Sequence, residues 1–391
     1  MVFALEKIVR PNILALKPYR SARDDYNSGL LLDANENNFG PVSLMGDSLV
    51  VKSEDNPLSM HRYPDPFGIK VKEQFIKFRA AVPSIDNVFV GVGSDEVIDL
   101  VVRIFCSPGV DQILITPPTY GMYKVTSQIN DVSVVSIPLT LDDSKFQLQT
   151  DMVLEELKRN PLIKVIWLCS PGNPTGSILK MTDIRKILDS GYNGIVVVDE
   201  AYIDFCTDQN TSAVPLINEY PNVLVMQTLS KSFGLAGVRI GFAISHKDII
   251  QLMNNVKAPY NVNSLSQNAA YEALSSASIQ SMKRVVKEII YQRDNFLIPG
   301  LLKLPRVKKI LGTNDANFVL VQFCNPLGEP DNDLAINIYK TLADDFDVVV
   351  RFRGSEPGCL GCLRITVGLS QENSLVISTL EKVINLLTSP Q

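Results

Sequence analysis

A single lysine between two apolar runs is the residue best placed to do covalent chemistry. Lys231 follows the run Val223–Met226 and precedes the run Ile240–Ile244. Both runs are apolar enough to be buried strands. A lysine held between buried strands must pair with an anion, reach solvent or lose its proton. Because serines flank it and Arg239 follows eight residues later, we expect an amine that reacts with a carbonyl beside an anion clamp. The alternative is an ordinary loop lysine.

Asp199 is the second candidate, because it ends the aliphatic run Ile195–Val198. A carboxylate at that position is costly unless a cation meets it. The protonated ring nitrogen of pyridoxal phosphate is such a cation. The same cofactor needs a lysine amine and a phosphate clamp, which Lys231 and Arg239 could supply. The alternative for Asp199 is the N-cap of a helix.

Three further segments place polar or aromatic groups directly after predicted strands. Asn173 begins an Asn-Pro-Thr-Gly turn, and its amide could donate to the cofactor's phenolate oxygen. Gly93 precedes Ser94 and Asp95 at a predicted helix start, where backbone N–H groups can cradle a phosphate. The ring of Tyr120 could cover a planar cofactor. Each has a plainer alternative: a simple β-turn, a weak Gly-x-Gly match and a core tyrosine.

The middle of the chain alternates predicted strands with predicted helices, such as 95–105 and 182–188. Thr182 is the expected N-cap of the second helix, and Gly191 lies just past its end. This pattern predicts an α/β fold with a mostly parallel sheet covered by helices on both faces. Ligands of such sheets bind beyond the carboxyl ends of the strands, where the candidate residues fall. The predicted strands are Val88–Val92, Gln112–Thr116, Val132–Ile137, Val165–Cys169, Ile195–Val198, Val223–Gln227 and Ile240–Ile244.

The pattern changes near both ends of the chain. Residues 1–40 predict an N-terminal arm and residues 41–280 the large cofactor-binding domain. Residues 281–391 predict a smaller α+β domain that packs with the arm. Its expected elements are helices at Met282–Phe296 and Ser374–Leu387 and strands at Phe318–Phe323, Val348–Phe352 and Leu363–Val367.

Composition excludes several classes of function. The 391 residues carry a net charge of −5, which offers no basic footprint for nucleic acid. No stretch approaches the ~20 apolar residues of a membrane span, and the N-terminus has no signal-peptide or transit pattern. Six scattered cysteines indicate reduced thiols and a cytoplasmic protein. Cys359 and Cys362 form one Cys-x-x-Cys pair without a second pair, so we expect no metal site.

Several of these motifs together resemble the fold-type I pyridoxal-phosphate aminotransferases. They are Asn173-Pro-Thr-Gly, Asp199-Glu-Ala-Tyr202, Ser230-Lys231-Ser232 and Arg239-Ile-Gly. Other segments are similar to the histidinol-phosphate aminotransferases, and the likeness runs from about residue 10 to 385. They are Pro18–Arg23, Asn35-Glu-Asn, Arg62-Tyr63-Pro, the Tyr120 motif and Gly358–Gly368. One departure is Asn38, where that family usually has proline.

The resemblance implies a homodimer with shared active sites and a role for each matching residue. Lys231 would hold the cofactor covalently and shuttle the proton, while Asp199 would pair with the ring nitrogen. Asn173 and Tyr202 would contact the phenolate oxygen, and Tyr120 would stack on the ring. The cofactor phosphate would be bound by the backbone amides of Ser94 and Asp95, by Ser230 and Arg239, and by Tyr63 of the partner subunit.

For the substrate, the resemblance implies a phosphate clamp of Tyr19, Arg351 and Arg364, with Asn35 also at the substrate site. Arg353 is the alternative to Arg351, because it lies two residues away on the same face of a strand. The implied reaction is transamination between histidinol phosphate and 2-oxoglutarate, which gives imidazole-acetol phosphate and glutamate in histidine biosynthesis. Three alternatives stay open: an aromatic amino-acid aminotransferase, a threonine-phosphate decarboxylase and a non-catalytic regulator domain.

Overall fold

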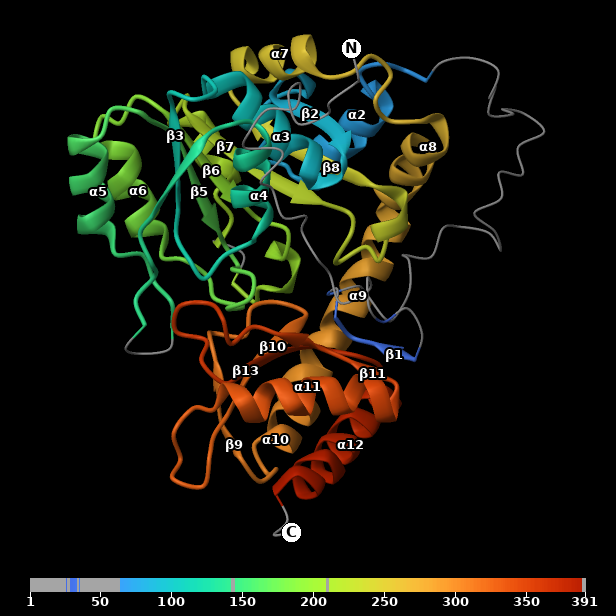
Figure 1. Cartoon of the computed structure of the whole chain (residues 1–391). Helices are drawn as coiled ribbons and strands as arrows, with labels where there is room; N and C mark the ends of the chain where they lie inside the picture. Colours follow the sequence, from blue (N-terminus) through green and yellow to red (C-terminus); the bar gives the residue numbers. More distant parts are fainter. Residues whose placement is uncertain are drawn as a thin grey trace, which may run out of the picture.

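The chain forms a larger unit built on one sheet and a smaller unit built on another (Figure 1). The computed structural model describes residues 26, 29–33, 35, 64–141, 145–208 and 211–388. Tyr19, Tyr63, Asn38 and most of the predicted arm lie outside the described residues. The short strand β1 (Leu30–Leu31) belongs to the described part of that arm, and it pairs in parallel with β11 (Val348–Val349) of the smaller unit.

Seven strands form the larger sheet in the order β2-β8-β7-β6-β5-β3-β4. Strand β8 is antiparallel to both of its neighbours, β2 and β7. The remaining pairs, from β7-β6 to β3-β4, are parallel. This is the mostly parallel sheet that the aliphatic runs predict. The strands are β2 (Val88–Val92), β3 (Gln112–Ile115), β4 (Ser133–Ser136), β5 (Ile163–Cys169), β6 (Ile195–Asp199), β7 (Val223–Thr228) and β8 (Ile240–Ser245).

Both faces of this sheet are buried, because successive strand residues pack into different cores. In β5, Val165 and Trp167 join one core, whereas Ile166 and Leu168 join the other. Helices α3, α4 and α7 contribute to the first core, and α2, α5, α6 and α8 contribute to the second. The helices are α2 (Ile69–Phe78), α3 (Gly93–Phe105), α4 (Met122–Ile129), α5 (Thr150–Arg159), α6 (Met181–Asp189), α7 (Lys247–Val256) and α8 (Ser264–Ala273). Short 3₁₀ helices are η3 (Ile85–Asn87), η4 (Ile203–Phe205), η6 (Val214–Asn218) and η7 (Ala236–Val238).

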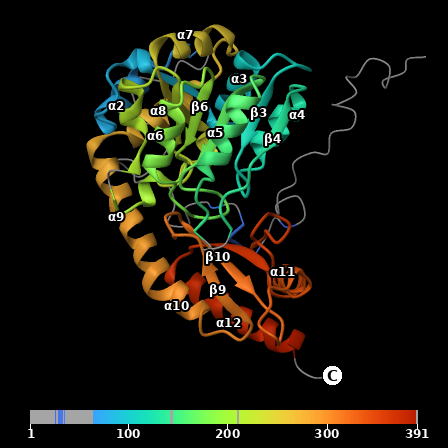
Figure 2. The ribbon, with the colours of Figure 1, turned by 90° about the vertical axis from the view of Figure 1, so that its left-hand side faces the viewer.

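The smaller unit is a four-stranded antiparallel sheet with helices on it. Its strand order is β12-β13-β10-β9. The long helix α9 (Ser276–Gln292) runs from the larger unit to the smaller one in both views (Figures 1 and 2) and continues through the π-helical turn η8 (Arg293–Leu297). The other elements are α10 (Ile298–Leu301), β9 (Val307–Leu311), β10 (Phe318–Phe323), α11 (Asn332–Phe346), β12 (Arg351–Phe352), β13 (Cys362–Thr366) and α12 (Ser370–Thr388).

Two local predictions were wrong. The run Val348–Phe352 is not one strand, because Val348–Val349 pairs with β1 while Arg351–Phe352 pairs with β13. Thr182 is not an N-cap, because α6 begins at Met181 and its N-cap, Lys180, makes no side-chain capping bond. Gly191 does follow the helix end, with a positive φ of 77°. The predicted domain boundary near residue 280 falls inside α9, and no helix in the described ranges is long and apolar enough to cross a membrane.

Candidate active site

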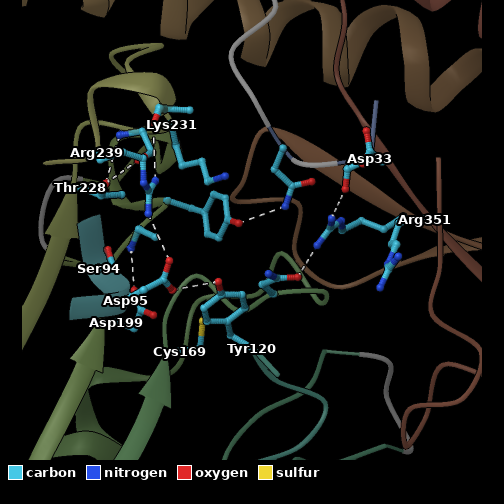
Figure 3. Close-up of a pocket in the computed structure, with 17 residues that line it drawn as sticks. Asp33, Ser94, Asp95, Tyr120, Cys169, Asp199, Thr228, Lys231, Arg239 and Arg351 are labelled. Atoms are coloured by element: carbon cyan, nitrogen blue, oxygen red, sulfur yellow. Dashed lines mark hydrogen bonds and ion pairs between the residues drawn. The ribbon is translucent and has the colours of Figure 1, made fainter. Parts of the chain in front are cut away.

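One cavity collects the residues at the carboxyl edge of the larger sheet together with residues of the smaller unit (Figure 3). Ser94 follows β2, Lys231 follows β7, and Asp199 is the last residue of β6. Arg239 instead precedes β8, and it reaches the same edge because β8 runs antiparallel to its neighbours. The sheet topology therefore brings these residues together from distant parts of the chain.

The N-terminus of α3 forms a cradle for an anion. Gly93 adopts a positive φ of 69°, and a Cβ atom there would lie 2.4 Å from Arg239 Nη2. The Arg239 guanidinium donates to Asp95 Oδ2 at 3.2 Å and remains half exposed. Ser94 Oγ is buried and makes no hydrogen bond within the described part of the chain. Backbone N–H groups at a helix start, a guanidinium and hydroxyls are the donors that a phosphate requires. Ser230, buried at the start of the loop after β7, adds another hydroxyl.

Asp199 is a buried carboxylate with one strong hydrogen-bond donor. The Tyr123 hydroxyl donates to its Oδ2 at 2.5 Å, and the Ala201 N–H donates to its Oδ1 at 3.2 Å. Burial raises the pKa of Asp199 to about 6, although the bonds from Tyr123 and Ala201 lower it. Tyr123 is fully buried and stacks on Trp167, with ring centroids 4.7 Å apart. Because Asp199 caps no helix, the N-cap alternative is wrong.

Its neighbour Glu200 is also buried, but it forms hydrogen bonds with a different set of partners. The Glu200 carboxylate accepts hydrogen bonds from the backbone N–H of Ala213 and from the side chains of Ser212 and Gln227. Burial raises the pKa of Glu200 to about 7. Glu200 does not line the cavity, whereas Asp199 does.

Lys231 points its amine into the cavity beside Tyr202. Its Nζ lies 5.9 Å from the centre of the Tyr202 ring. The Tyr202 hydroxyl accepts a hydrogen bond from Asn35 Nδ2 at 3.0 Å, and burial raises its pKa to about 12. Asn35 is itself fixed by Thr366 and Asn317 of the smaller unit. The amine is thus placed next to a neutral phenol that both units hold in position.

Two arginines of the smaller unit line the opposite side of the cavity. Arg364 is 6% exposed and donates to Asn173 Oδ1 and to the Asp33 carbonyl oxygen, both at 2.5 Å. Arg351 is its cross-strand neighbour. Figure 3 places Arg351 and Asp33 on one side, and Lys231, Arg239, Ser94 and Asp199 on the other. Arg353 is absent from the lining, which favours Arg351 over it.

All predicted site residues within the described ranges line this one cavity, although their individual roles remain predictions. They are Asn35, Ser94, Asp95, Tyr120, Asn173, Asp199, Tyr202, Ser230, Lys231, Arg239, Arg351 and Arg364. Sequence reasoning missed Tyr123. No local signal marks it, because Tyr123 lies on an amphipathic helix where an aromatic residue is ordinary core material; its buried hydroxyl finds its partner only in the fold. In the described ranges no group of three or more histidine, cysteine, aspartate or glutamate residues could hold a metal ion.

Comparisons with known proteins agree with this geometry. Residues 29–377 match the family model for aminotransferase class I and II. Histidinol-phosphate aminotransferase of Candida maltosa is 44% identical over 98% of this chain and 99% of its own length. The enzyme of the same name from Schizosaccharomyces pombe is 47% identical over 98% of each chain. The crystal structure of histidinol-phosphate aminotransferase from Sinorhizobium meliloti, in complex with pyridoxal-5'-phosphate, has a TM-score of 0.83 at 22% identity and covers 97% of this chain and 98% of that one.

The chain therefore belongs to the class I and II aminotransferases, and the predicted fold class is confirmed. Within that class it belongs to the histidinol-phosphate aminotransferase family.

Proposed function

We propose that this chain transfers an amino group between histidinol phosphate and 2-oxoglutarate, giving imidazole-acetol phosphate and glutamate in histidine biosynthesis. One observation carries the proposal: the cavity that Lys231 and Asp199 line is also lined by two arginines of the smaller unit, Arg351 and Arg364, and Figure 3 places Arg351 across the cavity from Lys231 and Asp199. A substrate with an amine at one end and a phosphate at the other matches this arrangement. The identity of 44% and 47% to two histidinol-phosphate aminotransferases, over nearly the full length of the chain, supports the same substrate.

The residues present fit pyridoxal phosphate. The α3 N-terminus with Ser94, Ser230 and Arg239 suits its phosphate, and the lack of a Cβ at Gly93 lets the Arg239 guanidinium approach this helix start closely. The buried Asp199 carboxylate suits a protonated ring nitrogen, because a cation removes the cost of burying its charge. Tyr202 and Asn173 suit the phenolate oxygen, and Tyr120 suits the ring face.

Each polar group then has a defined task. Pyridoxal phosphate supplies an electron sink that stabilises negative charge at the substrate α-carbon. Lys231 Nζ is the amine that would hold the cofactor, and the same amine would take the proton from the substrate α-carbon. Asp199, oriented by the Tyr123 hydroxyl, keeps the ring nitrogen protonated. Arg351 and Arg364 fix the far end of the substrate, so that its α-carbon faces the Lys231 amine.

The proposal extends to a homodimer in which Tyr63 of the partner subunit completes the phosphate site. Exposed apolar side chains on three neighbouring elements support it: Phe67 and Ile69 at the start of α2, Val92 at the end of β2 and Leu265 on α8. Mixing Lys231→Ala protein with Tyr63→Ala protein tests it. Heterodimers should regain activity at one of their two sites. Failure to regain any would mean that Tyr63 acts within its own subunit or not at all.

The activity is tested by single-turnover half-reactions, followed through the cofactor's absorbance change. Native protein should react with both glutamate and histidinol phosphate. Arg351→Ala should slow the histidinol-phosphate half-reaction far more than the glutamate half-reaction, because losing a charge-assisted partner at a desolvated site typically costs ~2 to 5 kcal/mol. Arg284→Ala is the matched control, since Arg284 is exposed on α9 and does not line the cavity. Faster reaction with phenylalanine than with histidinol phosphate would refute the substrate.

A further inference from the structure

An ion pair lies next to the two cavity arginines without lining the cavity. Arg353 Nη2 contacts Glu356 Oε1, and their side chains are only 11% and 23% exposed. The turn between them is closed by a hydrogen bond from the Glu356 N–H to the Arg353 carbonyl oxygen at 3.1 Å. Neither residue belongs to the cavity lining. No step of the proposed reaction uses this pair.

Three arginine side chains project from the same face of the small sheet, on the side where this glutamate lies. Arg351 is directly opposite Arg364 in the antiparallel pairing of β12 and β13. The Arg353 N–H donates to the Cys362 carbonyl oxygen at 2.9 Å, which continues the same pairing. Residues two apart on a strand share a face, and so do directly opposed residues. Like charges gathered on one partly buried face repel one another unless an anion or a carboxylate offsets them.

Glu356 is the carboxylate that interacts with all three. Burial raises its pKa, while Arg353, then Arg364, then Arg351 lower it through their charges. Its Oε2 atom is buried without a hydrogen bond in the part of the chain that the structure describes. Asp33 also lies on this side, but it lines the cavity itself. Glu356 can thus weaken the field of Arg351 and Arg364 without blocking the place where an anion would bind.

We propose that Glu356 is a specificity-determining residue of the substrate anion site. Its fixed negative charge offsets part of the positive charge of Arg351 and Arg364, and so it sets how strongly the site prefers a dianion to a monoanion. This inference rests on the proposed function, in which that site takes a substrate phosphate. The energy between a fixed charge and a bound ion is proportional to the charge of the ion. Removing Glu356's charge should therefore change the logarithm of affinity twice as much for a dianion as for a monoanion.

The test is Glu356→Gln, which keeps the shape and an oxygen acceptor for Arg353. The probes are methyl phosphate and methanesulfonate, two tetrahedral ions, titrated calorimetrically into holoenzyme at pH 8, where the phosphate ester is a dianion. Because the cofactor fills its own phosphate site, these ions report on the substrate site. We expect methyl phosphate to bind about tenfold more tightly and methanesulfonate about threefold more tightly than to native protein. Glu381→Gln, on an exposed stretch of α12, makes the same change in net charge and should alter neither.

A second variant separates charge from shape. Arg353→Gln combined with Glu356→Gln removes both charges of the pair, so its affinities should return to within about twofold of the native values. Equal changes for the two ions, or no return in the double variant, would overturn the inference. So would a native holoenzyme that binds neither ion. If native protein binds both ions with the expected response but does not turn over histidinol phosphate, the proposed function fails and the anion site stands.

Discussion

Tyr123→Phe removes a single oxygen atom, and we expect it to slow catalysis without weakening substrate binding. The Tyr123 hydroxyl donates a 2.5 Å hydrogen bond to Asp199 Oδ2. Hydrogen bonds to charged groups contribute ~1.5 to 3 kcal/mol. Because 1.36 kcal/mol corresponds to tenfold in rate, loss of this bond should lower the single-turnover rate with glutamate roughly 10- to 100-fold. Tyr123 does not line the cavity, so KM should change little.

The same variant should change how the stability of the apoprotein depends on pH. Burial raises the pKa of Asp199 to about 6, above its value of ~3.9 in an unfolded chain. The folded protein then holds this proton more tightly than the unfolded chain, so stability falls as pH rises through that window. Phenylalanine removes a bond that lowers this pKa, so in the variant the fall should extend to higher pH. The difference in free energy of unfolding should therefore grow from pH 6 to pH 8.

Tyr192→Phe is the matched control. The Tyr192 hydroxyl donates to the Ile163 carbonyl oxygen at 3.2 Å, and Tyr192 precedes β6 at the edge of the sheet away from the cavity. It should leave the rate unchanged. If Tyr123→Phe also kept its rate within twofold of native, Tyr123 would be only a packing partner of Trp167, and its proposed effect on Asp199 would be refuted.

Three other substitutions test the cofactor contacts. Lys231→Ala should fold and retain pyridoxal phosphate but lose turnover by several orders of magnitude, and borohydride reduction of native protein should label the peptide that contains Lys231; a label elsewhere would contradict this assignment. Asp199→Asn should lower kcat more than it raises KM, and weaker binding at unchanged kcat would argue for a purely structural aspartate. Gly93→Ala should weaken the apoprotein's affinity for pyridoxal phosphate about tenfold or more, because its Cβ would lie 2.4 Å from Arg239 Nη2 at a φ that alanine rarely adopts. Unchanged affinity would mean that the cofactor phosphate does not bind at this helix start.

The sequence predicted the larger sheet well because its strands are buried on both faces. Such strands are nearly continuous aliphatic runs, so Val88–Val92 was predicted with the bounds that the structure gives it. The run Val348–Phe352 misled for the same reason. Hydrophobicity marks residues 348–350 as buried, but it does not show that pairing with β1 ends at Val349 and pairing with β13 begins at Arg351. Pairing partners far apart in sequence leave no local signal.

The candidate site could be predicted where a residue type is unusual for its position. Lys231 and Asp199 stand out because charged groups at the ends of aliphatic runs are costly. Tyr123 does not stand out, because an aromatic residue in an amphipathic helix is ordinary core material. Its role depends on α4 packing next to the end of β6, where Asp199 is the last residue. Only the folded chain provides that contact.

The sequence alone does not show which of the adjacent carboxylates, Asp199 or Glu200, faces the cavity. Both are almost fully buried, and burial raises the pKa of each. Judged only by the free-energy cost of burying a charge, either could be the partner of a cationic ring nitrogen. Glu200, however, already accepts bonds from Ala213, Ser212 and Gln227, whereas Asp199 ends its strand with its carboxylate at the cavity. Glu200 therefore fixes the chain that follows β6, and this leaves Asp199 as the carboxylate that can meet a ligand.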